Sequence, residues 1–374
     1  MNFDLPYNEE LSKRFVSDYN LPIPIINRRA FFYHLDLYEK HYGAFTKYKK
    51  LWNMINEKFE GDAQKFLDHY YEVRESMIQS VLNNEAYQYF NTMPMERFEI
   101  KDRPNITSNN IYNEENVGKW FISVDLKKAN FQALNLVDRD ILLNSDTYEE
   151  FVDKFTDLEY IKESKYTRQV LFGKLNPKRH ITVEKYYITN LYKKLNDDFI
   201  ILKNKCVSLH NDEIVFQSAE LSNGVAQKLV KDIEKVAAEM GLDVKVECFT
   251  LRGYALYSLD KPHFKKTFYT KEYSSFIKGK YKLISAPLPF HSIIYRFMNG
   301  YVERVTELDR LIQYEGLVAR LESFFQVEKI EGQSKQRPEG TLLFNRNKKK
   351  KTIKIKLDKT YINLKEFFKL WNFF

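Results

Sequence analysis

Two acidic residues, each next to a short apolar strand, are the strongest candidates for chemistry in this chain. Asp125 ends the largely apolar run 119–125, and Asp212 lies in an Asn-Asp turn between the runs 205–210 and 213–217. Asn and Asp are typical turn residues, so the second pattern predicts a hairpin of two strands. A strand end and a neighbouring hairpin turn are rigid supports that can bring two carboxylates together.

Paired carboxylates on rigid supports are the ligands that Mg²⁺ prefers, and Mg²⁺ often needs only one or two of them because it keeps several waters. Two such ions about 3.5–4 Å apart can catalyse phosphoryl transfer. We therefore expect Asp125 and Asp212 to bind two Mg²⁺, for which Mn²⁺ could substitute. Glu213 is a candidate third acid, and the backbone carbonyl of Leu126 is a candidate ligand.

The elements around these acids predict an α+β fold with one antiparallel sheet and packed helices. A strand over 119–125 is followed by a helix over 181–195, the hairpin, a helix over 219–240 and a strand over 243–249. The strand over 243–249 alternates polar and apolar residues, which is typical of a half-exposed strand.

The first hundred residues are predicted to be helical. Apolar residues recur at helical intervals over 28–52 and again over 63–83. The polar, Asn-rich segment 101–116 reads as a linker. We expect three regions, with boundaries at 1–118, 119–262 and 263–374, and a short helical element at 140–200 inside the second.

Positive charge is concentrated in the last third of the chain. The whole chain has a net charge of +8, but residues 261–374 hold 24 Lys and Arg against 11 Asp and Glu. Such a basic region is typical of a protein that contacts phosphates. Bases and aromatics alternate over 261–269, a pattern suited to following a nucleic-acid backbone while stacking on bases. The candidate nucleic-acid-binding residues are Lys261, Lys265, Lys266, Lys278, Lys280 and Lys282.

Composition excludes several other classes. No apolar run approaches the ~20 residues of a membrane span, and the N-terminus lacks the features of a signal peptide. Cys206 and Cys248 form no CxxC pair, so we expect no zinc motif or disulfide framework, and a reducing cytoplasmic location fits. P-loop, GxGxxG, HExxH and GxSxG motifs are absent.

The runs around both acids resemble motifs of family A DNA polymerases. Residues 123–134 resemble motif A, and residues 207–216 are similar to motif C, with Asn211 inserted between His210 and Asp212. The resemblance covers residues 120–249. It implies a polymerase-like palm at 119–262, short fingers at 140–200, a thumb-like basic region at 263–374, and DNA polymerase activity with two metal ions.

The run 165–173 is similar to the family's nucleotide-binding helix. Arg168 stands four residues before Phe172-Gly173, where the family has a phosphate-binding Lys. The resemblance implies that Arg168 and Lys165 bind the triphosphate and that Phe172 lies beside the nascent base. It also places Asn130 and Phe131 near the sugar. Asn130 replaces a Glu of the family, which leaves the preferred sugar open.

The short separation of Phe172 from Asp212 is closer to that of reverse transcriptases. The implied partners are a primer–template, nucleoside triphosphates and a replication protein partner. The size and the AT-biased composition of the chain suggest a phage, a virus or a mobile element as its source. Three alternatives stay open: a reverse transcriptase or RNA-synthesising polymerase on the same palm, a metal-dependent nuclease, and a non-catalytic nucleic-acid-binding protein.

Overall fold

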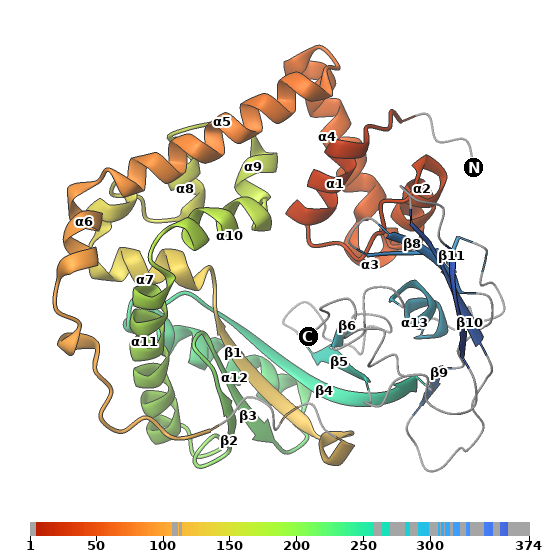
Figure 1. Ribbon diagram of the computed structural model, residues 1–374. Coiled ribbons are helices and arrows are strands. Elements are labelled where there is room, and N and C mark those ends of the chain that lie inside the picture. Colours follow the sequence, from red (N-terminus) through yellow and green to blue (C-terminus); the bar gives the residue numbers. More distant parts are fainter. Residues whose placement is uncertain are drawn as a thin grey trace.

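A computed structural model describes most of the first 256 residues and shorter parts of the rest (Figure 1). The described residues are 5–106, 111, 114–256, 263–269, 281–284, 291–298, 306, 308–309, 311–314, 317–321, 327–329, 340–346 and 352–357. They form helices and antiparallel sheets in largely separate regions, which confirms the predicted α+β class.

Seven of the described strands form one antiparallel sheet in the order β2-β3-β1-β4-β5-β6, and β9 pairs with the end of β4. The strands are β1 (Trp120–Leu126), β2 (Cys206–Leu209), β3 (Glu213–Ser218), β4 (Val244–Leu256), β5 (His263–Tyr269), β6 (Tyr281–Ile284) and β9 (Val327–Lys329). Because β1 is antiparallel to both β3 and β4, the strands β3 and β4 run parallel on either side of it. The unit β3-α12-β4, with β1 between its two parallel strands, is a split β-α-β arrangement.

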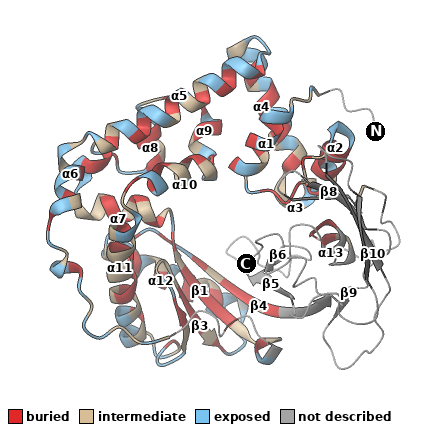
Figure 2. Cartoon of the chain, viewed as in Figure 1, coloured by how far each residue is buried: buried red, intermediate tan, exposed pale blue. Residues whose placement is uncertain are grey.

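Helices α11 (Pro177–Asp198) and α12 (Asn223–Glu239) cover one face of this sheet. Every second residue of the central strands, such as Val124 on β1 and Ile214 on β3, packs into the core beneath these helices. Successive side chains of a strand point to opposite faces, so Asp125 and Glu213 belong to the other face. Figure 2 shows buried residues along β1 and the first part of β4.

A second core joins the N-terminal helices to the helices that follow β1. The first group consists of α1 (Glu9–Asp18), α2 (Arg28–Leu37), α3 (Glu39–Tyr42), α4 (Ala44–Phe59), α5 (Ala63–Leu82), α6 (Glu85–Thr92) and the 3₁₀ turn Glu96–Phe98. The second group consists of α7 (Ala129–Val137), the 3₁₀ turn Arg139–Leu142, α8 (Tyr148–Asp153), α9 (Glu159–Glu163) and α10 (Lys165–Lys174). Figure 1 shows α5 running above α8, α9 and α10.

The described C-terminal segments include a second antiparallel sheet in the order β11-β10-β8-β7. Its strands are β7 (Leu311–Tyr314), β8 (Leu317–Leu321), β10 (Gly340–Arg346) and β11 (Thr352–Leu357). Helix α13 (His291–Met298) packs against the N-terminal helices, where Tyr38 lies 3.1 Å from Nδ1 of His291. A side-chain contact therefore joins the N-terminal helices to α13.

Several predicted elements differ from those observed. The predicted helix over 28–52 is divided into α2, α3 and α4, and Gly43 between the last two has a left-handed φ of 59°. The strand predicted over 243–249 is longer than expected, because β4 continues to Leu256 and its second half pairs with β5 and β9. The hairpin strands lie within one residue of their predicted ends.

Candidate acidic site

Asp125 and Asp212 meet at one end of the central sheet. The backbone N–H of Leu126, the residue after Asp125, donates a 2.8 Å hydrogen bond to the backbone carbonyl of Asp212. In the sheet register Asp125 is the direct partner of Glu213. The end of β1 and the β2–β3 turn are thus joined by the main chain, as the spacing predicted. All three acidic side chains are partly buried.

A further acid, Glu247, reaches the same face of the sheet from β4. Its register partner on β1 is Ser123, two residues before Asp125. The hydroxyl of Ser123 donates a 2.6 Å hydrogen bond to Oε1 of Glu213, and Glu247 forms an ion pair with Lys245. Acids from three neighbouring strands therefore share one face around the end of β1.

Burial and charge repulsion raise the pKa of two of these acids, Asp125 and Asp212. Burial, together with the smaller effects of the negative charges of Asp212, Glu213 and Glu247, raises the pKa of Asp125 to about 7, and Lys245 opposes this rise. Burial also raises the pKa of Asp212, which His210 partly offsets. Nδ1 of His210 lies 3.9 Å from Oδ1 of Asp212. The site has more negative charge than its neighbours neutralise, which favours the binding of cations.

The β2–β3 turn is held in place by Arg103. Its Nη2 donates to the backbone carbonyls of Leu209 at 3.2 Å and His210 at 2.8 Å. The backbone N–H of His210 closes the turn by donating to the carbonyl of Glu213 at 2.8 Å. The linker predicted over 101–116 therefore contributes a residue that fixes the position of Asp212.

A buried carboxylate on α11 lies near enough to Asp212 for the two charges to interact. Glu184 on α11 is 5% exposed, and its Oε1 has no hydrogen-bond partner among the described residues. Burial, with a smaller contribution from the charge of Asp212, raises the pKa of Glu184 to about 7. An unpaired carboxyl in such surroundings is stable mainly in its neutral form.

The predicted metal ligands fit Mg²⁺ as a pair of carboxylates. Among the residues that the structure describes, no three acidic, histidine or cysteine side chains converge closely enough to hold an ion by themselves. Mg²⁺ is commonly bound by one or two carboxylates, with waters and substrate phosphates completing its shell. Asp125 and Asp212 can fill that role. Metal binding by Asp125, Asp212 and the Leu126 carbonyl stays a prediction, as does the role of Glu213.

Three aromatic rings connect α10 to α7, the helix that follows β1. The Tyr148 ring lies 6.2 Å from that of Phe131 on α7 and 6.4 Å from that of Phe172 on α10. Phe131 and Phe172 are 3% and 2% exposed, so both rings belong to the core in this structure. Their predicted places beside the sugar and the base stay predictions. Asn130, in the first turn of α7, is partly buried.

The two predicted triphosphate-binding residues differ in their surroundings. Lys165, the first residue of α10, is exposed. Arg168 is partly buried, and its guanidinium carbon lies 5.6 Å from the centre of the Tyr148 ring.

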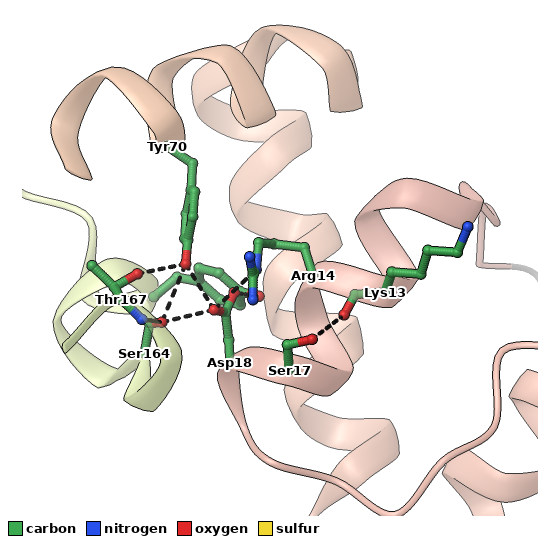
Figure 3. A network of polar contacts seen from close by, with 8 residues as sticks. Lys13, Arg14, Ser17, Asp18, Tyr70, Ser164 and Thr167 are labelled. Atoms are coloured by element: carbon green, nitrogen blue, oxygen red, sulfur yellow. Dashed lines mark hydrogen bonds and ion pairs between the residues drawn. The ribbon is translucent and has the colours of Figure 1, made fainter. Parts of the chain in front are cut away.

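The N-terminus of α10 is anchored by a buried polar network (Figure 3). Asp18 on α1 is 0% exposed and accepts hydrogen bonds of 2.7 Å from Tyr70, Tyr160 and Ser164. Arg14 forms an ion pair with Asp18, with Nε 3.1 Å from Oδ1. Ser164 in turn caps α10 by accepting from the backbone N–H of Thr167 at 2.9 Å. The N-terminal helices therefore set the position of the helix that carries Arg168.

The predicted nucleic-acid-binding lysines can be placed only in part. Lys265 and Lys266 lie on β5 and Lys282 on β6, where Lys266 and Lys282 are register partners. Lys261, Lys278 and Lys280 lie outside the described residues.

Several residues around this site were not predicted from the sequence. Glu247 could have been predicted, because it is one of the polar residues of the alternating strand over 243–249 and therefore lies on the same face as the other polar residues. Glu184 is also detectable as an acid on the apolar side of a helix, between Val183 and Ile188 in the core. Arg103 and Tyr148 carry no such signal, since their importance depends on contacts with distant segments.

No protein-family model, curated protein or solved structure matches this chain. No helix among the described residues combines the length and the apolar character that crossing a membrane requires.

Proposed function

We propose that this protein is a palm-type nucleic-acid polymerase that adds nucleotides to a primer strand on a template. The reaction is nucleotidyl transfer from nucleoside triphosphates with two Mg²⁺, held by Asp125 and Asp212. DNA synthesis is the first choice, because the runs around both acids resemble those of family A DNA polymerases.

One observation carries this proposal. Two carboxylates, one at the end of β1 and one in the β2–β3 turn, are joined by the Leu126–Asp212 backbone hydrogen bond and share an excess of negative charge. The excess is a cost to the folded protein unless a cation or a proton offsets it. A stable fold that keeps Asp125, Asp212 and Glu213 together is better explained by cation binding than by packing.

The surrounding residues support the same chemistry. Asp125 and Asp212 would bind two ions, which, when bound, activate the primer 3′ hydroxyl and stabilise the leaving pyrophosphate. Arg168 carries a permanent positive charge and a planar donor group suited to phosphate oxygens. Arg103 keeps Asp212 in register with Asp125 by holding the turn. The basic last third of the chain would bind the nucleic-acid backbone.

Primer extension tests the proposal. Labelled DNA/DNA, RNA/DNA and RNA/RNA primer–templates are each incubated with dNTPs or rNTPs, in Mg²⁺ or Mn²⁺. We expect extension by the wild type, and loss of at least a hundredfold in Asp125→Asn and Asp212→Asn. Asp243→Asn is the matched control, because Asp243 is an exposed acid that pairs with Lys127. The preferred template and sugar would distinguish a DNA polymerase from a reverse transcriptase or an RNA-synthesising polymerase.

Other outcomes identify the alternatives. Release of nucleotides from the labelled strand, lost in the same two variants, would indicate a nuclease. Tight, salt-dependent binding without any reaction, unchanged in Asp125→Asn and Asp212→Asn, would refute the polymerase assignment and indicate a binding protein.

A further inference from the structure

Two cationic side chains from different elements converge on Tyr148. Nζ of Lys128, which follows β1, lies 5.6 Å from the centre of the Tyr148 ring. The guanidinium carbon of Arg168 on α10 lies at the same distance of 5.6 Å from that centre. Two positive charges thus lie around one buried ring, and a nearby anion would offset their repulsion.

The anion in this structure is Glu149, the residue after Tyr148. Nζ of Lys128 donates to both carboxylate oxygens of Glu149. Although burial opposes the effect, the hydrogen bond and charge of Lys128 and the charge of Arg168 lower the pKa of Glu149. One carboxylate therefore experiences both cations.

The backbone holds Lys128 in an unusual conformation. Lys128 has φ 51° and ψ 48°, the left-handed region, immediately before α7. An L-residue with a side chain adopts this region at a cost of about 1 kcal/mol or more, and such residues concentrate at functional sites. The backbone carbonyl of Lys128 accepts from the N–H groups of Phe131 at 2.8 Å and Gln132 at 3.2 Å. The conformation is thus fixed by the start of α7.

The ring that both cations approach, that of Tyr148, has a hydroxyl group without a hydrogen-bond partner among the described residues. The Tyr148 side chain is 0% exposed. A buried hydroxyl without a partner costs about 1–3 kcal/mol. Packing alone would favour Phe at this position, whereas a ligand with acceptor oxygens could satisfy the hydroxyl.

We propose that Lys128 and Arg168 form a two-cation site for the phosphate groups of a nucleoside triphosphate, and that Glu149 occupies this site in the free protein. The nucleotide binds by exchange: its phosphate oxygens replace the Glu149 carboxylate at Lys128. The identity of the ligand rests on the proposed function, since nucleoside triphosphates are the expected substrates. Lys128 is only three residues from Asp125, so the phosphates would lie near the metal-binding carboxylates.

The exchange is energetically accessible. Lys128 and Glu149 are 28% and 46% exposed, so water compensates when their ion pair opens. Ion pairs of this kind contribute about 0–1 kcal/mol. A polyphosphate carries more charge than one carboxylate and makes charge-assisted hydrogen bonds to both Lys and Arg. The pair is therefore weak enough to exchange with a stronger anion.

Equilibrium binding without nucleic acid tests the proposal. Calorimetry would measure dGTP, dATP and inorganic tripolyphosphate against the full chain in EDTA, so that the metal site does not contribute. We expect Lys128→Gln to weaken binding of all three about tenfold and Glu149→Gln to tighten it severalfold. Lys127→Gln is the matched control, because Lys127 pairs instead with Asp243 at 2.8 Å, and its affinity is expected to equal that of the wild type.

A double variant separates exchange from simple charge effects. In the Lys128→Gln background, Glu149→Gln is expected to increase the affinity for triphosphates less than it does in the wild type. The reason is that Glu149 no longer has a lysine from which it must be displaced. Equal affinities for the wild type, Lys128→Gln and Glu149→Gln would overturn the proposal. So would equal losses in Lys127→Gln and Lys128→Gln, which would indicate an unspecific effect of charge.

The outcome is independent of the polymerase assay. If primer extension fails but the affinities change as expected, the triphosphate site stands and the polymerase assignment is lost. If primer extension succeeds and the affinities do not change, the assignment stands and this inference is wrong. Near-equal melting temperatures of the variants would exclude unfolding as the cause.

Discussion

At the residue scale, the main feature of this protein is a group of carboxylates whose burial and mutual repulsion reduce the stability of the fold. Asp125 has a pKa of about 7 because it is buried and faces Asp212, Glu213 and Glu247. Glu184 reaches a similar value mainly through burial. Such clusters are more common at functional sites than in purely structural positions.

Metal binding is expected to stabilise the protein through these residues. A ligand that binds only the folded state raises stability by mass action. Ten millimolar MgCl₂ is expected to raise the melting temperature of the wild type by several degrees, measured by scanning calorimetry at pH 8. Asp125→Asn and Asp212→Asn are expected to lose this increase, whereas Asp243→Asn keeps it. An equal increase in all four proteins would indicate an ionic-strength effect.

Glu184 is expected to make the protein less stable at alkaline pH. Its pKa is about 7 when folded and about 4.5 when unfolded, so its contribution is fully present below pH 4.5 and is lost as the pH rises toward 7 and above. Between pH 5 and pH 8 the loss is about 2 kcal/mol. Urea unfolding of Glu184→Gln in EDTA is expected to show a smaller decrease over this range than the wild type.

The control for this measurement is Glu239→Gln, because Glu239 is an exposed residue near the end of α12. Its pH dependence is expected to equal that of the wild type. If Glu184→Gln also had the same pH dependence as the wild type, the carboxyl would be ionised in the folded protein and in contact with a cation or with water.

At the scale of elements, α10 depends on the N-terminal helices. Asp18 joins α1 to Tyr70 of α5, to Tyr160 of α9 and to Ser164, the residue that caps α10. The helix with the candidate phosphate-binding residues is thus supported by segments almost 150 residues away in the chain.

Removal of Asp18 is expected to destabilise the fold strongly. Asp18→Ala leaves the Arg14 guanidinium without its ion-pair partner and three hydroxyls without their acceptor, which costs about 3 kcal/mol or more. Lys13→Ala removes an exposed i,i+4 ion pair with Glu9 and is expected to cost less than 0.5 kcal/mol by the usual strength of such pairs, about 0.3–0.5 kcal/mol. Urea unfolding compares the two. Similar values for both variants would mean that the network contributes little.

The joint between α3 and α4 requires a glycine. Gly43 has φ 59°, and an added Cβ would meet no atom within 4 Å, so only the backbone conformation opposes a side chain. Gly43→Ala is expected to cost about 1 kcal/mol. Gly224→Ala, in the first turn of α12 and equally open, is expected to be neutral or slightly stabilising. Thermal unfolding of both variants checks the difference.

At the scale of the whole molecule, a cluster of side chains joins α2 to α13 and to Asp309. Tyr33 on α2 donates a 2.5 Å hydrogen bond to Asp309, and Nε of Arg296 on α13 lies 2.9 Å from the same carboxylate oxygen. Asp309 is 0% exposed. The N-terminal helices and the segment 291–309 therefore stabilise each other.

Loss of the Tyr33 hydroxyl is expected to lower the local stability of both α2 and α13. Tyr33→Phe removes one hydrogen bond to a buried charge, at a cost of about 1.5–3 kcal/mol. Hydrogen exchange is expected to become faster in both α2 and α13. Tyr89→Phe, at a residue that is 65% exposed, is the control and is expected to change neither helix. Faster exchange in α2 alone would show that the two segments are not coupled.

Local pattern by itself predicted β1, the β2–β3 hairpin, the helices α11 and α12 and the two principal acids. Apolar runs bounded by Asn, Asp and Ser marked β1, β2 and β3, and the Asn211-Asp212 pair marked the turn, because strand and turn preferences are properties of neighbouring residues. Only the tertiary structure decided the rest of the site. The register that sets Glu247 opposite Ser123, the approach of Glu184 from α11 and the convergence of Lys128 and Arg168 on Tyr148 all join distant segments. Such contacts depend on burial and packing of the whole chain, which no local pattern records.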